Sequence, residues 1–142
     1  MIRAIGVLLI IAASATAFDL NEVKAEPDLE KRAKAALDYA NRAITTSREA
    51  YTHNEFKKAL ASLDEVGQAA ELCLASLDAT GKSARKNPKP FKRAEMQIND
   101  LLRRLESLES DFGLDDRPAV SSVTKRLQEI HDALISRIMS KK

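Results

Sequence analysis

Aromatic residues and cysteine are scarce in this chain of 142 residues. Tryptophan is absent and aromatic residues make up only 4% of the sequence, which argues against an aromatic platform that stacks on sugars or bases. Cys73 is the only cysteine. No internal disulfide can form, so the apolar core has to stabilise the fold alone.

Motifs typical of catalysis or cofactor binding are missing as well. The sequence has no Gly-rich phosphate loop, no serine nucleophile elbow and no Cys-x-x-Cys-His haem motif. The two histidines, His53 and His131, do not belong to the paired Glu-x-x-His motifs that hold metals in helical bundles, because Gln128 stands three residues before His131. We therefore predict that the protein is not an enzyme and holds no cofactor or metal ion.

The lone cysteine is the one candidate nucleophile. Cys73 lies on an apolar stripe between Ala70 and Leu77. A cysteine in such surroundings is typically a buried and unreactive thiol. We interpret Cys73 as part of the core.

The chain has no large excess of either charge. It carries 23 basic and 21 acidic residues, a net charge of +2. If Arg3 is removed with a leader segment, the balance is 22 against 21, or +1. Such a chain has no overall field that would attract nucleic acid, so we expect no nucleic-acid partner.

The only long apolar run stands at the beginning of the chain, in "MIRAIGVLLIIAASATA" (1–17). Arg3 precedes the apolar run, and Ala15-Thr16-Ala17 offers the small-x-small pattern of a signal peptidase site. The run is shorter than the roughly 20 residues that span a bilayer. We predict cleavage after Ala17, a periplasmic or secreted protein that begins at Phe18, and no transmembrane segment in the mature chain. An uncleaved membrane anchor is the alternative.

Four apolar stripes with a spacing of three and four residues predict four helices, and no alternating pattern predicts a strand. The stripes run from Leu29 to Tyr51, from Phe56 to Leu77, from Phe91 to Phe112 and from Val120 to Ile138. Leu63, Leu105 and Leu127 are central members of these stripes.

Glycine and proline number four each, and most of them mark where the predicted helices begin and end. Pro27 and Pro90 suit a first helical turn, while Gly81 and Gly113 suit the position after a last turn. "THN" (52–54) and "LDDRP" (114–118) are tight connections, in which Asn54 and either Asp115 or Asp116 are the expected N-caps. We predict an extended N-terminal segment at 18–26 and one helical domain at 27–142, with hairpins at 27–80 and 91–142 and a linker at 81–90.

Two long antiparallel hairpins bury their apolar faces best against one another, which predicts an all-α, four-helix up-down bundle. The hairpins also show a faint repeat, since "PDLEKRA" (27–33) aligns with "PKPFKRA" (88–94) and brings Tyr51 onto Phe112. The stretch "AYTHNEFKKALASLDEVGQAAEL" (50–72) resembles a tetratricopeptide hairpin. That resemblance implies stacked hairpins as the alternative architecture.

The linker region "GKSARKNPKPFKR" (81–93) is strongly basic. Its cations are Lys82, Arg85, Lys86, Lys89, Lys92 and Arg93, and it contains no acid. In an up-down bundle the linker lies at the same end as the N-terminal acids, which are Asp19, Glu22, Glu26, Asp28 and Glu30. We favour neutralisation of the linker by these acids, and the alternative is that the six cations bind an external anion.

These observations favour an exported, non-catalytic interaction or scaffolding protein of the cell envelope, whose partner is another envelope protein. The alternative is an anion-binding envelope protein that docks on lipid headgroups or on a polyanionic glycan through residues 82–93. The sequence leaves the oligomeric state open.

Overall fold

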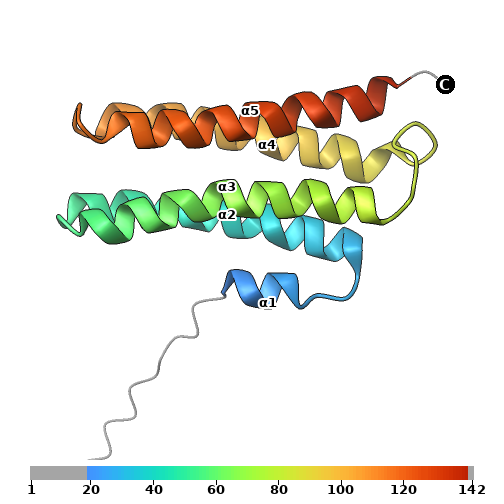
Figure 1. Cartoon of the computed structure of the whole chain (residues 1–142), viewed down its shortest axis with the longest axis horizontal. Coiled ribbons are helices and arrows are strands. Elements are labelled where there is room, and N and C mark those ends of the chain that lie inside the picture. Colours follow the sequence, from blue (N-terminus) through green and yellow to red (C-terminus); the bar gives the residue numbers. More distant parts are fainter. Residues whose placement is uncertain (1–18, 141–142) are drawn as a thin grey trace, which may run out of the picture.

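The structure of the protein, a computed structural model, describes residues 19–140 (Figure 1). Its helices in this range are α1 (Leu20–Lys24), α2 (Leu29–Thr52), α3 (Phe56–Ala79), α4 (Pro88–Asp111) and α5 (Arg117–Met139), and no strand occurs among the described residues. The predicted all-α class is confirmed. The predicted signal peptide, residues 1–17, lies outside the described part of the chain.

The long helices form two antiparallel hairpins, α2–α3 and α4–α5, that pack against each other (Figure 1). Between the hairpins α2 contacts α4 and α3 contacts α5, and in both of these pairs the helices run in the same direction. The linker therefore joins α3 to a helix on the diagonal of the bundle. The four helices enclose one core cluster, so the predicted four-helix bundle is confirmed.

Helix boundaries follow local backbone chemistry, with some departures from the predictions. The Asp28 carboxylate accepts a hydrogen bond from the Lys31 N–H at 2.9 Å and caps α2. Gly81 adopts a φ of 68° directly after α3, as expected for a residue that ends a helix. Pro88 begins α4, two residues before the predicted start at Pro90.

Neither predicted side-chain cap at the tight connections forms. Asn54 adopts a left-handed φ of 61°, which asparagine tolerates well, and leaves the N-cap position of α3 to Glu55. Asp116 does occupy the N-cap position of α5, but its side chain makes no capping hydrogen bond. Its carboxylate instead accepts a hydrogen bond from another part of the fold.

The prediction of an extended segment at 18–26 is wrong for residues 20–24, which form the short helix α1. The Asp19 carboxylate accepts a hydrogen bond from the Asn21 N–H at 3.0 Å and caps this helix. Leu20 and Val23, three residues apart, are buried as α1 packs on α2 and α3. One turn is too short to show a periodic stripe in the sequence, which is why the segment looked extended.

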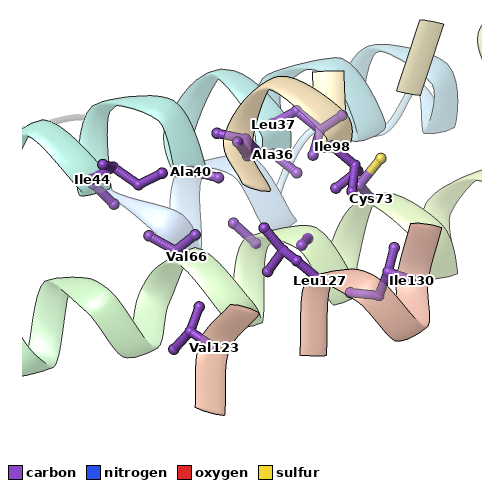
Figure 2. Close-up of a cluster of buried hydrophobic side chains, with 14 of the residues drawn as sticks. Ala36, Leu37, Ala40, Ile44, Val66, Cys73, Ile98, Val123, Leu127 and Ile130 are labelled. Carbon is purple, nitrogen blue, oxygen red and sulfur yellow. The ribbon is translucent and has the colours of Figure 1, made fainter. Parts of the chain in front are cut away.

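The core is filled by the predicted stripes, with Ile44, Val66, Ile98 and Leu127 contributed by the four long helices (Figure 2). The buried polar side chains among the described residues are three serines. One of these, Ser47, donates a hydrogen bond from its hydroxyl to the Ala59 carbonyl at 2.8 Å and links α2 to α3. A buried hydroxyl with a partner avoids the cost of an unpaired polar group.

Arg126 of α5 lies across α3 and joins the two hairpins. Its guanidinium contacts the Asp64 carboxylate at 3.0 Å and the Glu71 carboxylate at 2.9 Å. Gly67 of α3 makes room for it, since a Cβ at this position would lie 2.5 Å from the Arg126 Cζ atom. The mid-helix glycine, which the sequence analysis did not explain, thus serves an interhelical contact.

An aromatic cluster closes the end of the bundle that holds both tight connections. The Tyr51 and Phe112 rings stack with centroids 4.0 Å apart, and the Phe56 ring meets Tyr51 edge-on at 5.0 Å. The Tyr51 hydroxyl accepts a hydrogen bond from the Gly113 N–H at 2.7 Å and donates one to the Asp116 carboxylate at 2.9 Å. The first hairpin therefore holds the turn of the second hairpin in place.

Candidate anion-binding surface

The linker between α3 and α4 is held by local hydrogen bonds and by one buried residue. The Arg85 N–H donates to the Ser83 hydroxyl at 3.2 Å, and the Asn87 N–H donates to the Ser83 carbonyl at 2.9 Å. Ala84 is buried, as is Phe91 in the first turn of α4, and both belong to the core cluster. With Ala84 turned inward, the charged residues around it face solvent.

All six predicted cations are exposed, and the structure pairs one of them with an N-terminal acid. The Lys82 Nζ atom lies 3.0 Å from the Glu30 carboxylate. Among residues 19–140, no salt bridge involves the other five cations, to which we refer as the cationic surface: Arg85, Lys86, Lys89, Lys92 and Arg93. The expected neutralisation of the linker is therefore limited to Lys82.

Three of the five N-terminal acids make local hydrogen bonds instead. Asp19 and Asp28 cap the helices that follow them, and the Glu26 carboxylate accepts a hydrogen bond from the Asp28 N–H at 3.2 Å. A free N–H group at the start of a helix attracts a neighbouring carboxylate. These nearby N–H groups therefore compete with the linker cations, which are distant in sequence, for the carboxylates.

The beginning of α4 reinforces the positive charge of this region. No acidic residue stands in its first turn, and Asn87 makes no side-chain cap. A helix N-terminus carries a partial positive charge, so the cations Lys89 and Lys92 add to the potential of the helix instead of offsetting it. The placement is unfavourable for an isolated bundle, by about 0.3–1 kcal/mol for each exposed charge.

The first turns of α4 also border a shallow surface depression of about 580 Å³. It is lined by Pro88, Lys89, Lys92, Arg93, Met96, Gln97 and Asp100. Met96 is 65% exposed, which is high for a large apolar side chain. Met96 lies outside the apolar stripe of its helix, so the stripe pattern does not distinguish it from other outward positions.

Cys73 is fully buried and lines a small cavity of about 40 Å³, together with Glu30 and Arg93 among others. Burial raises the pKa of the Cys73 thiol from 9.0 to about 12. The predicted burial is confirmed. A thiol of this kind is nucleophilic only when the fold opens.

We expect a small aromatic disulfide reagent to modify Cys73 slowly in the native protein and rapidly in denaturant. Slow labelling should persist at pH 9, because the native thiol stays protonated there while a free thiol would be about half ionised. Absorbance of the released thiolate measures the rate. Rapid native labelling at pH 7 would contradict the assignment of Cys73 to a closed core.

The two histidines lie at different places in the bundle. His53 is the C-cap residue that follows α2; its Nδ1 atom is 2.7 Å from the Glu49 carbonyl, and it is exposed. The His131 Nε2 atom lies 2.8 Å from the Glu95 carboxylate, so this pair bridges α5 and α4. Within the described range, no group of three or more histidine, cysteine or acidic side chains is placed to hold a metal ion.

Comparison of the chain with protein-family models, with curated proteins and with solved structures gives no match. Of the helices formed by residues 19–140, none is long and apolar enough to cross a membrane. A function therefore has to be argued from the residues of the candidate surface itself.

Proposed function

We propose that this chain is an exported, non-catalytic helical module that acts by binding an anionic component of the cell envelope through its cationic surface. The observation that carries the proposal is the set of five exposed cations, Arg85, Lys86, Lys89, Lys92 and Arg93, with no ion pair to the described chain. In a scaffolding role the partner is an envelope protein with an acidic surface. Lipid headgroups or a polyanionic glycan offer the same charge.

The architecture supports this role because it holds the cations on an ordered support. Ala84 and Phe91 anchor the linker to the core, while the Tyr51 cluster closes the opposite end of the bundle. A cationic residue near an anionic surface contributes up to about 1 kcal/mol. Five of them supply up to about 5 kcal/mol, a dissociation constant on the order of 0.1–1 mM. Charge alone thus predicts weak, salt-sensitive binding.

Export is part of the proposal and rests on residues 1–17, with cleavage after Ala17. The intact mass of the protein recovered from the exported fraction tests it, and a chain that begins at Phe18 is expected. Recovery of a chain that retains Met1 would contradict cleavage.

Retention on immobilised heparin tests the binding surface. We expect the wild-type protein to be retained at low salt and released as salt screens the attraction. A variant with Arg85, Lys86, Lys89 and Lys92 each replaced by Gln should elute at much lower salt. The matched control replaces four other exposed cations by Gln, namely Lys57, Lys58, Arg103 and Lys125.

The two variants carry the same net charge, so a difference between them reports the position of the cations. The control should elute close to the wild type. Equal elution of both variants would show that only net charge matters and would overturn the proposed surface.

A further inference from the structure

The apolar side chain beside the cationic surface narrows the class of partner. Basic residues and Met96 share one face of α4, because they recur every three or four residues. They are Lys89, then Lys92 and Arg93, then Met96. Met96 is 65% exposed within this basic face. A short face that combines cations with an apolar side chain is suited to a surface that is anionic outside and apolar just beneath.

We infer that the cationic surface docks on the anionic headgroups of a lipid bilayer, with Met96 entering the boundary between headgroups and acyl chains. This inference rests on the proposed function and names its partner. Basic residues at such an interface keep their charge among the headgroups while their aliphatic stems cover apolar surface. A polyanionic glycan would satisfy the cations but would leave Met96 in water.

The acids around the surface mark its limits. Asp100 lines the far side of the depression and pairs with Arg103 at 3.6 Å, and Glu30 pairs with Lys82 on the side of α2. The carboxylates at these two positions would repel anionic headgroups. The contact is therefore confined to the linker and to the side of α4 that its first turns form. Met96 lies seven residues, about 10 Å, along α4 from Lys89, so the start of α4 has to lie along the bilayer surface for both side chains to reach it.

The opposite end of the bundle takes no part in this contact. The Tyr51–Phe112 cluster and both tight connections lie at the end away from the linker (Figure 1). The protein would bind at the surface of the bilayer, and no helix of residues 19–140 would cross the bilayer.

The experiment is sedimentation of the mature chain with vesicles of phosphatidylglycerol and phosphatidylcholine (3:7), compared with vesicles of phosphatidylcholine alone. We expect binding to the anionic vesicles at 150 mM NaCl, loss of most binding at 500 mM NaCl, and no binding to the neutral vesicles. The Arg85, Lys86, Lys89 and Lys92→Gln variant should lose binding, while the Lys57, Lys58, Arg103 and Lys125→Gln control should retain it.

A second pair of variants tests the apolar contact at constant charge. Met96→Gln should weaken vesicle binding about tenfold, as expected for the loss of one buried apolar side chain. Leu114→Gln is the matched control, because Leu114 is 77% exposed and lies at the opposite end of the bundle. It should leave binding unchanged. All of the replaced residues are exposed, so no variant should unfold at a clearly lower temperature than the wild type. Removal of Lys89 and Lys92 from the start of α4 should slightly raise the unfolding temperature, because these charges oppose the helix dipole.

Other outcomes separate this inference from the proposed function. Retention on heparin without binding to anionic vesicles would overturn the lipid inference and leave the anion-binding role. Absence of both would overturn both. Release from vesicles by 10 mM inorganic phosphate at constant ionic strength would indicate a small-anion site, and an unchanged affinity of Met96→Gln would indicate contact by charge alone. Either result would contradict the inference as stated.

Discussion

Replacing Leu105 by Ala is expected to lower the free energy of unfolding by about 2–5 kcal/mol. Leu105 belongs to the core cluster that the four long helices share, and its side chain is fully buried. The substitution removes apolar contacts and leaves a cavity that the surrounding helices fill only in part. Urea titration followed by circular dichroism measures the change.

Lys125→Ala is the matched control, because Lys125 lies exposed on α5. A surface substitution of this kind changes stability by less than about 0.5 kcal/mol. If Leu105→Ala and Lys125→Ala unfolded at the same urea concentration, the assignment of the α4 stripe to the core would be wrong.

Phe112→Ala should destabilise the protein by about 3–5 kcal/mol. The Phe112 ring is buried and stacks on Tyr51, whose hydroxyl also contacts Gly113 and Asp116. The substitution therefore removes a large buried ring and loosens the turn that the Tyr51 hydroxyl holds. Thermal and urea unfolding of the purified variant measure the loss.

Phe56→Ala provides a sharp comparison for this prediction. Phe56 contacts the same Tyr51 ring but is 45% exposed, so its replacement by Ala removes less buried apolar surface. Phe56→Ala should therefore lower the free energy of unfolding much less than Phe112→Ala does. A Phe56→Ala variant as unstable as Phe112→Ala would mean that the cluster depends on Tyr51 packing in general and not on burial of Phe112.

The charges of the linker bear both on stability and on the proposed function. Positive charges at the start of α4 do not stabilise that helix, and the described acids neutralise only Lys82. Functional residues often occupy positions that are locally unfavourable, such as a positive charge at a helix N-terminus. The core residues Leu105 and Phe112 can therefore be varied as probes of stability, and Lys89 and Met96 as probes of binding.

Periodicity in the sequence was sufficient to predict the buried face of each long helix. Leu63, Leu105 and Leu127 were expected in the core, and each is at most 1% exposed. A period of 3.6 residues places these positions on one side of a helix, whichever other helix packs against that side. Cys73 was predicted to be buried on the same ground and lies in the core (Figure 2).

The six cations of residues 81–93 were also visible in the sequence, where the "GKSARKNPKPFKR" stretch contains no acid. Their ion pairs were not. The pairing of Lys82 with Glu30, 52 positions apart in the chain, depends on where the linker crosses the end of the bundle. Asp19, Glu26 and Asp28 accept hydrogen bonds from backbone N–H groups at or near the start of a helix, and composition does not reveal this competition.

Only the tertiary structure decided which helices are neighbours and which side chains lie uncovered. A stripe shows that a face is buried but not which helix covers it, so the side-by-side packing of α2 with α4 and the diagonal course of the linker came from the assembled fold. The same reasoning applies to α1, whose single turn is stabilised by its contacts with α2 and α3. The need for glycine at position 67 is likewise apparent only from the packed helices, because Arg126 of α5 lies against it. The exposure of Met96 also depends on the packing, because no other helix covers it. Local sequence determines the shape and polarity of each helix, whereas contacts between residues distant in the chain exist only once the helices have packed.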